Sequence, residues 1–369
     1  MNLFGVMHAR AEGPRAPSDA ALGARKADHL DLCEGDAVAF RSKTTLLEGV
    51  RFLHQSLPEL ASNEVSTETQ LLGRTLRAPI VIAAMTGGHE RAASINRGLA
   101  AIAEQRGIGL GLGSQRAMQR DPSMEWTYSV REWAPNILLL GNIGVVQARE
   151  TPTRDIEGLV RDVGADALCV HLNPAMELIQ SDGDRDFRGC VDALKRLSNE
   201  LSVPVVAKET GNGLSPQTIA KLVEAGIRYV DTSGAGGTSW VGVETLRADG
   251  VRRTIGDSLW DWGIPTAPSI HYARQANMTT IATGGVRSGH DVARALALGA
   301  SAAGIARPVL QSLQQGGEEG ALTFIDGIVE ELRAVMLLTG SATPAALREA
   351  PRIISGELDR WMGAAGPTP

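Results

Sequence analysis

Two glycine-bearing turns in the last third of the chain combine features that bind phosphate. The segment TGGVRSG occupies residues 283–289, and GIARP follows at 304–308. Glycines let the backbone approach a phosphate closely, and the N–H groups that begin a helix favour an anion. The two turns therefore predict a phosphate site. Flavin, nucleotide and sugar-phosphate enzymes all use this arrangement, so the turns alone do not choose among them.

Polar residues also follow a series of short apolar runs. The runs occupy residues 78–84, 108–113, 136–144, 167–173, 203–209, 228–234, 279–285 and 301–307. The first six of them end at or just before Thr86, Ser114, Asn142, His171, Lys208 and Ser233. If the runs are the parallel strands of a barrel, their carboxyl ends meet at one face, where barrel enzymes place their chemistry. Lys208 and Asn142 are the least ordinary of these, because each closes a strongly apolar run.

A flavin fits these positions better than a plain sugar phosphate. With its phosphate at the last two turns, the ring would lie over the strand ends, where Lys208 could stabilise negative charge on the reduced ring. Thr86, Ser114 and Asn142 could hydrogen-bond the ring edge, which is the usual way that a protein tunes a cofactor. No G-x-G-x-x-G follows an early strand, so NADPH would act only as a transient reductant.

Two further groups of charged residues are candidates for binding a metal–diphosphate. Arg25, Lys26 and His29 lie close together upstream, and Arg116 could join them in an anion clamp. The alternative is the solvated start of a helix. Beyond the fourth run, the segment 171–189 contains acids that suit Mg²⁺ bound to a diphosphate. A solvated acidic loop is the alternative there.

The spacing of the runs indicates the fold. Near-continuous apolarity over four to seven residues is typical of strands covered on both faces. Amphipathic stretches lie between the runs, at about 92–106, 153–163, 188–200, 215–226 and 289–299. Eight strands alternating with helices predict an α/β fold, a (β/α)₈ TIM barrel. A doubly wound open sheet is the rival, although eight units would make an unusually long one.

The domain organisation follows from this reading. We expect a loose arm at 1–20, a segment at 21–77 that covers the barrel mouth, the barrel at 78–345, and a C-terminal tail with a helix at 346–369. The sixth run is followed by about forty residues, 235–278, before the seventh. Loops of that length are usually lids or binding loops. Trp240, Trp260 and Trp262 lie there, either in such a lid or in local packing.

Composition excludes several classes of protein. The 369 residues are 43% hydrophobic and 21% charged, with a formal charge of −6. These values argue against a disordered chain, and the acidic balance argues against a nucleic-acid binder. The three cysteines form no C-x-x-C pair, and no apolar run approaches the roughly 18 residues of a membrane span. We therefore expect a soluble, cytoplasmic protein with no nucleic-acid or membrane partner.

Taken together, these blocks resemble the type 2, FMN-dependent isopentenyl-diphosphate isomerases over about residues 22–345. The matching blocks are RKADHL, MTGG, GLGSQR, GNIG, HLNPAMEL, VVAKETGNG, DTSGAGGTSW, WGIPT and TGGVRSG with GIAR. The resemblance implies a barrel that forms homo-oligomers, tetramers or octamers, and interconverts isopentenyl and dimethylallyl diphosphate. It also implies reduced FMN as the acid–base group, Mg²⁺, and no net redox change.

The resemblance also implies roles for individual residues. The substrate diphosphate would contact Arg25, Lys26, Ser114, Gln115, Arg116, His171 and Asn173, with His29 lining the same site as a catalytic candidate. FMN would contact Met85, Thr86, Gly87, Ser114, Asn142, Lys208, Ser233, Thr238, Gly284, Gly285, Arg287, Ala306 and Arg307. Glu177 would hold Mg²⁺.

One position departs from the family pattern. The family has a glutamine, assigned to substrate binding and proton transfer, where this chain has Met176. A thioether can neither donate nor relay a proton. Gln180, one helical turn further on, could substitute. The alternatives left open are a different prenyl or alkene substrate on the same scaffold, a flavin oxidoreductase, or a catalytically inactive binding protein.

Overall fold

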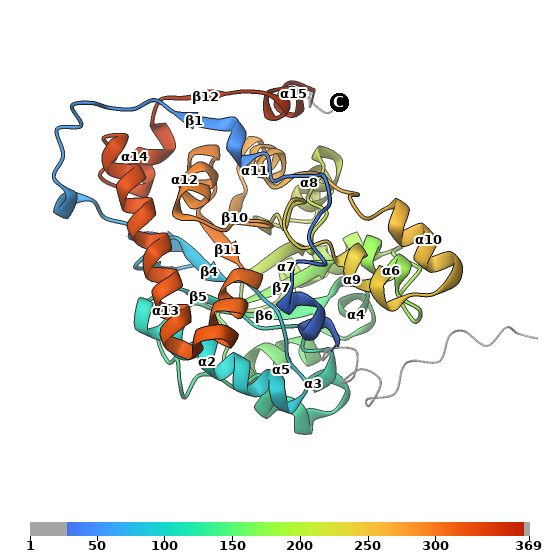
Figure 1. Cartoon of the computed structure of the whole chain (residues 1–369). Helices are drawn as coiled ribbons and strands as arrows, with labels where there is room; N and C mark the ends of the chain where they lie inside the picture. The colour runs from blue at the N-terminus through green and yellow to red at the C-terminus, as the bar shows by residue number, and fades with distance from the viewer. Residues whose placement is uncertain (1–27, 365–369) are drawn as a thin grey trace, which may run out of the picture.

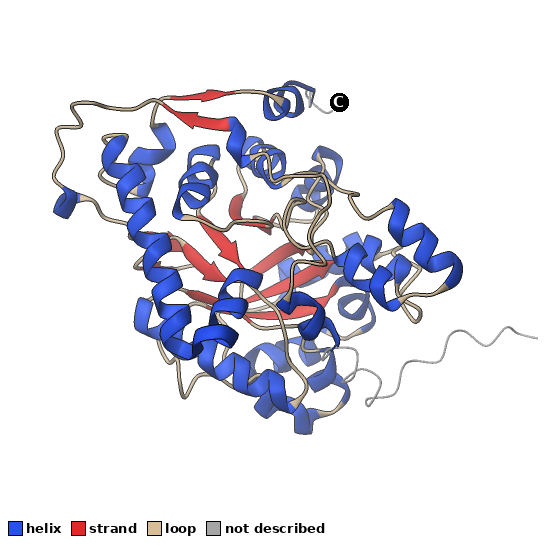
Figure 2. Cartoon of the chain, viewed as in Figure 1, coloured by secondary structure: helices blue, strands red, loops and turns tan. Residues whose placement is uncertain are grey.

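The centre of the molecule is a closed barrel of eight parallel strands. The computed structural model describes residues 28–364, and helices surround the strands on all visible sides (Figures 1 and 2). Each predicted apolar run contains one strand, so the predicted (β/α)₈ fold is confirmed. In barrel order the strands are β4 (Ile80–Ile82), β5 (Gly109–Gly111), β6 (Leu139–Gly144), β7 (Ala167–Leu172), β8 (Val205–Glu209), β9 (Tyr229–Asp231), β10 (Thr279–Thr283) and β11 (Ala302–Ile305).

The predicted helices form the outer layer. α8 shows how local sequence sets their bounds: Ser215 Oγ accepts a hydrogen bond from Thr218 N, and Pro216 follows at the first helical position. Gly226, with φ of 78°, comes two residues after the helix ends. The surrounding helices are α2 (Glu90–Arg106), α4 (Val145–Glu150), α5 (Thr153–Val163), α7 (Cys190–Glu200), α8 (Pro216–Glu224), α11 (Thr266–Gln275), α12 (Gly289–Leu298) and α13 (Arg307–Leu338), which is kinked at Gly317.

The interval expected to be a long loop is helical. Residues 235–278 contain α9 (Trp240–Arg247), α10 (Gly250–Ser258) and α11, of which α11 belongs to the barrel layer. Trp260 is buried, its indole N–H donates to Ala39 O at 2.9 Å, and the Arg41 guanidinium lies 3.9 Å from its ring centroid. We call residues 235–265 the lid. It holds the N-terminal segment against the barrel.

The N-terminal extension covers both ends of the barrel. Residues 28–34, part of the segment 21–77, are helical and lie at the mouth. Part of that segment differs, because the hairpin of β2 (Thr69–Leu71) and β3 (Arg74–Leu76) packs Leu71 and Leu76 against Val81 and Leu138, where the strands begin. Burying two leucines over the barrel interior accounts for this placement.

The C-terminal residues form a small addition at the edge of the barrel. β1 (Val50–Phe52) pairs antiparallel with β12 (Arg352–Ile354), next to α14 (Pro344–Glu349) and α15 (Glu357–Ala364), at the upper edge of Figure 1. The short helices η1 (Leu47–Gly49) and η2 (Ser62–Glu64) flank β1. The predicted arm at 1–20 lies outside the described residues. Within residues 28–364, no helix is long and apolar enough to cross a bilayer.

Candidate active site

A cavity of about 250 Å³ opens where the carboxyl ends of the strands meet. Nearly all of the described residues predicted for the site line it. These are His29, Met85, Thr86, Ser114, Arg116, Asn142, His171, Asn173, Met176, Glu177, Gln180, Lys208, Ser233, Thr238, Gly284, Gly285, Arg287, Ala306 and Arg307. The barrel therefore brings together residues that are up to 278 positions apart in the sequence. Arg25 and Lys26 lie outside the described residues.

The two glycine turns form a cradle in which no side chain could replace hydrogen. A Cβ on Gly284 would lie 2.2 Å from Gly234 O, and one on Gly285 would lie 2.5 Å from Thr45 Cγ2. Both glycines have positive φ, 107° and 74°. The buried hydroxyl of Thr283 lies beside them and has no hydrogen-bond partner among the described residues. A cradle with an unpartnered hydroxyl fits a phosphate-bearing ligand.

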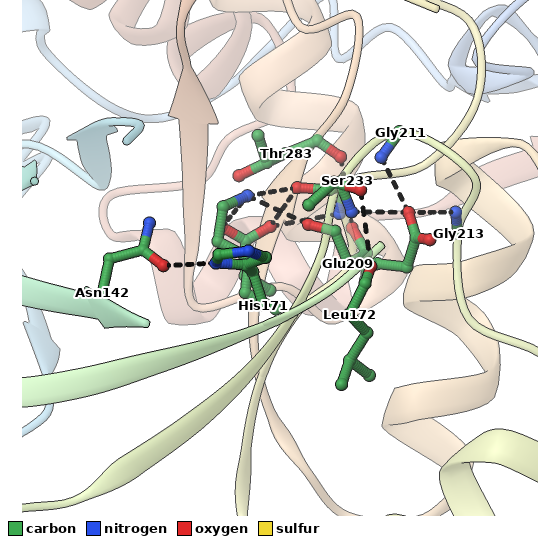
Figure 3. A network of polar contacts seen from close by, with 12 residues as sticks. Asn142, His171, Leu172, Glu209, Gly211, Gly213, Ser233 and Thr283 are labelled. Atoms are coloured by element: carbon green, nitrogen blue, oxygen red, sulfur yellow. Dashed lines mark hydrogen bonds and ion pairs between the residues drawn. The ribbon is translucent and has the colours of Figure 1, made fainter. Parts of the chain in front are cut away.

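Lys208 lies in a buried polar network at the ends of β8 and β9. Its Nζ donates to Ser233 Oγ at 2.5 Å and lies 3.1 Å from Asp231 Oδ2 (Figure 3). The strand register explains the contact, because Lys208 pairs directly with Asp231. Both side chains are nearly fully buried. Asp231 ends its strand in the sequence, yet its role as the counter-ion depends on a register that the sequence does not reveal.

Asn142 and His171 form a second pair, on β6 and β7. Asn142 Oδ1 lies 2.9 Å from His171 Nδ1 (Figure 3). Asn142 Nδ2 donates to Leu112 O at 3.0 Å. The amide of Asn142 is thereby fixed at both ends. This contact sets the orientation of the imidazole, which also lines the cavity.

Glu177 follows in α6 (Pro174–Ile179), directly after β7. One carboxylate oxygen accepts from Asn173 Nδ2 and the other from Asp184 N, both at 2.8 Å. Burial raises the pKa of Glu177, while Arg116 opposes that shift electrostatically. Within residues 28–364, no three His, Cys, Asp or Glu side chains gather as a ready-made metal site. A single buried carboxylate fits the pattern of Mg²⁺ sites completed by substrate phosphate oxygens and water.

Met176 lies in α6, Gln180 directly follows the last residue of that helix, and both line the cavity. The Met176 sulfur lies 4.0 Å from Asn173 Nδ2. The Gln180 amide donates to Asp182 Oδ1 at 3.1 Å. Gln180 therefore lies at the cavity, but its amide N–H is already hydrogen-bonded to Asp182.

Two residues predicted for the site do not face the cavity. Gln115 is fully buried: its Nε2 donates to Leu159 O and its Oε1 accepts from Asn142 N, both at 2.9 Å. Its amide connects the backbone of β6 to that of α5 and is turned away from the cavity. Gly87 packs against the ring of Tyr128, only 2.0 Å from where its Cβ would lie. A position at a strand end does not decide which way a side chain turns.

The imidazole of His29 is held by a carboxylate from the lid. Its Nε2 lies 2.8 Å from Glu244 Oε1, and its ring meets Trp240 edge-on at 5.2 Å between centroids. Glu244 is buried and also accepts from Arg247 at 2.9 Å. No local sequence pattern points to Glu244, apart from its place in the interval 235–278.

Comparisons with known proteins agree with this geometry. The fold is a (β/α)₈ barrel with a cradle suited to phosphate, and the FMN-dependent dehydrogenase family model, which matches residues 150–354, places it among the flavin-type barrels. Mandelate oxidase has a TM-score of 0.61 at 19% identity, covering 92% of this chain and 98% of that one. A lactate oxidase of Pediococcus acidilactici gives 0.62 at 16% identity, covering 94% and 97%. At such identities these structures support the fold alone.

Relatives of much higher identity narrow the class. An isopentenyl-diphosphate delta-isomerase of Synechococcus sp. is 47% identical, covering 90% of this chain and 96% of that protein. The protein of the same name from Methanothermobacter thermautotrophicus is 42% identical, covering 93% and 96%. The chain belongs to the FMN-dependent isopentenyl-diphosphate delta-isomerase family, as its sequence blocks predicted.

Proposed function

We propose that this protein is an FMN-dependent isomerase that interconverts isopentenyl and dimethylallyl diphosphate. The observation that supports this most directly is identity of 40–47% to isomerases over nearly the whole chain. The cavity adds chemical support, because it combines a glycine cradle, a buried lysine and an acid beside a cation.

FMN fits the residues present. Gly284 and Gly285 leave room for a phosphate, and the unpartnered Thr283 hydroxyl offers it a donor. Arg287 and Arg307 line the same end of the cavity. Lys208 and Asn142 lie further round the rim, where they would contact the flavin ring. When bound in its reduced form, FMN supplies an acid–base group and an electron-rich surface without net redox change.

The substrate diphosphate would lie toward Arg116 and Glu177. Arg116 lines the cavity and forms no ion pair with another residue of 28–364, which leaves its guanidinium available for a diphosphate. Glu177 would hold Mg²⁺ that also contacts the diphosphate oxygens. Ser114 and Asn173 line the same region and would complete the contacts.

The chain's own residues would then orient the alkene and control protons around it. The Lys208 ammonium, fixed by Asp231 and Ser233, would stabilise negative charge on the reduced ring. His29, oriented by Glu244, would stand at the substrate side of the cavity. Trp240 would exclude water from the hydrocarbon tail. Preorganised groups of this kind lower the barrier without rearranging during the reaction.

Met176 does not favour a different activity. The relatives that share up to 47% of this sequence are isomerases by name, and an oxidoreductase or an inactive protein has no comparable support. Because a thioether cannot relay a proton, proton transfer would depend on the acid–base chemistry that FMN supplies, and Gln180, directly after α6, could substitute for the family glutamine.

The remaining properties follow from the same proposal. NADPH would reduce FMN before turnover, and the protein would work as a tetramer or octamer. All three cysteines are free, which agrees with the reducing conditions of the cytoplasm.

The experiment that tests the proposal is an anaerobic turnover assay. Purified protein with FMN, NADPH, Mg²⁺ and isopentenyl diphosphate should form dimethylallyl diphosphate well beyond one equivalent of NADPH. Arg116→Ala should raise the KM for substrate, whereas Arg154→Ala, at an 87% exposed position, should not. NADPH consumption in step with product would instead indicate an oxidoreductase, and firm FMN binding without conversion would reject the isomerase.

A further inference from the structure

We propose that Glu209 is a positioning residue: its carboxylate clamps the turn after β8 and thereby holds Thr238 and Trp240 of the lid in the cavity wall. The inference rests on the proposed function in one respect, namely that the cavity behind this wall binds FMN and the prenyl diphosphate. The clamp itself is a property of the chain and is testable without substrate.

A single oxygen of Glu209 accepts hydrogen bonds from four consecutive backbone N–H groups. The distances from Oε2 are 2.6 Å to Thr210 N, 2.7 Å to Gly211 N, 2.5 Å to Asn212 N and 3.1 Å to Gly213 N. Gly213 N shares its hydrogen with Ser233 O at 3.2 Å. Figure 3 shows the nitrogens of Gly211 and Gly213 around the carboxylate of Glu209, with dashed lines marking the bonds. Glu209 itself is 5% exposed.

The turn needs such an acceptor because its backbone cannot bond to itself. Gly211 and Gly213 have φ of 143° and 72°, so the segment is neither helix nor strand. Buried backbone N–H groups without partners are costly. A carboxylate satisfies several of them at once with charge-assisted bonds, which are stronger than neutral ones. The shape of the turn therefore depends on the Glu209 side chain.

The clamped turn is the surface on which the lid rests. A Cβ on Gly211 would lie 3.2 Å from Thr238 O and 3.5 Å from Trp240 Cδ1, so the bare backbone is packed directly against both. Thr210, Gly211, Thr238 and Trp240 all line the cavity. A shift of the turn would move the wall.

The other end of the lid is tied to the same turn. Asn212 Nδ2 donates to Trp262 O at 2.7 Å, and Ile264 N donates to Asn212 O at 2.8 Å. The turn therefore contacts the lid near its beginning, at 238–240, and near its end, at 262–264. Between these two contacts, the Glu209 carboxylate accepts from the N–H groups of residues 210–213, and Ser233 O shares that of Gly213.

The main chain of Glu209 extends this role to Lys208. The carbonyl oxygen of Glu209 accepts from Lys208 Nζ at 3.2 Å. The same peptide group, which joins Glu209 to Thr210, donates its N–H to the Glu209 carboxylate. One residue thus orients both the ammonium on the barrel side and the lid on the outer side.

The test compares Glu209→Gln and Glu209→Ala with a matched control, Glu104→Gln. Glu104 also accepts a backbone N–H, from Asn136 at 3.0 Å, but at the end of α2 and away from the cavity lining. Hydrogen exchange should accelerate at 210–214 and 238–264 in both Glu209 variants by about tenfold or more, as expected for loss of a charge-assisted bond. FMN affinity should fall, most in Glu209→Ala, while Glu104→Gln leaves both measurements unchanged.

A second variant distinguishes the hydrogen bonds of Glu209 from the packing of the turn against the lid. Gly211→Ala keeps the carboxylate but places a methyl group against Thr238, so the lid should exchange faster and FMN should bind more weakly. A purely structural carboxylate would lower the Tm and raise exchange throughout the barrel. Wild-type exchange at 210–214 and 238–264 in Glu209→Ala would overturn the inference. Failure of the wild type to bind FMN would reject the proposed function, whereas the exchange result would still decide the clamp.

Discussion

Two sectors of the cavity rim are built in opposite ways. At β10 and β11, the wall is backbone: Gly284 and Gly285 approach neighbouring main-chain atoms so closely that a methyl group would overlap them. At β7 to β9, the wall is a network of buried side chains, with Lys208 and Asp231 in an ion pair. The first sector can recognise a ligand by shape and by N–H groups. The second can alter the electronic properties of whatever lies against it.

The difference between the two sectors predicts that one determines the affinity for FMN and the other the rate of turnover. Substitutions in the glycine sector should weaken binding of FMN in proportion to the backbone shift that they cause. In the side-chain sector, substitution of the Lys208 ammonium, which faces the cavity, should leave FMN bound and change turnover, whereas loss of the Glu209 carboxylate acts on binding through the turn that it holds. Results that reverse this order would show that the two sectors are not distinct in function.

The largest effect is expected for Gly284→Ala. The added Cβ would lie 2.2 Å from Gly234 O, at a φ of 107° that alanine rarely adopts. Backbone strain and overpacking together should lower FMN affinity about 1000-fold. Flavin fluorescence quenching measures it. Gly327→Ala is the control, since no atom lies within 4 Å of its Cβ position. Near-normal affinity in Gly284→Ala would place the phosphate elsewhere.

Lys208→Met should retain FMN but lose turnover. Removing a preorganised charge from a transition state costs about 100-fold in kcat. The change also leaves Asp231 buried without its cation, which should lower the free energy of unfolding by about 3–5 kcal/mol. The double variant Lys208→Met/Asp231→Asn should recover stability, measured by urea unfolding. If it also recovers turnover, Lys208 is structural and the assignment of chemistry to this sector is wrong.

The raised pKa of Glu209 should make the free energy of unfolding depend on pH. Burial raises this pKa from 4.5 to about 7, and the backbone N–H bonds of the turn reduce this rise without cancelling it. Between these values the folded protein binds more protons than the unfolded chain, so the free energy of unfolding falls as pH rises from 4.5 to 7. The linkage relation gives at most about 3 kcal/mol. Urea unfolding across this range should show a flatter profile for Glu209→Gln than for the wild type or Glu104→Gln. Parallel profiles would contradict the shift.

The sequence was sufficient for the barrel and for most of its rim. Short runs that are apolar throughout, without alternating polar residues, are typical of buried parallel strands. Barrel geometry then brings the carboxyl end of every strand to one face. It was insufficient for side-chain direction and for register. Gln115 follows a strand like Ser114, yet its amide is turned into the protein. The partners of His29 and Lys208, Glu244 and Asp231, depend on tertiary packing that no local pattern encodes.

Met176 tests whether the side-chain sector is complete. Its sulfur lies near the amide of Asn173, beside Glu177. A glutamine at position 176 could therefore accept a hydrogen bond from Asn173 Nδ2, which would orient its side chain. Met176→Gln should raise kcat about threefold to tenfold, below the range of a fully positioned acid–base group. Met176→Leu, which adds no polar atom, should give no gain. A loss of turnover in Met176→Gln would show that the cavity is adapted to the thioether and that protons move without help from this position.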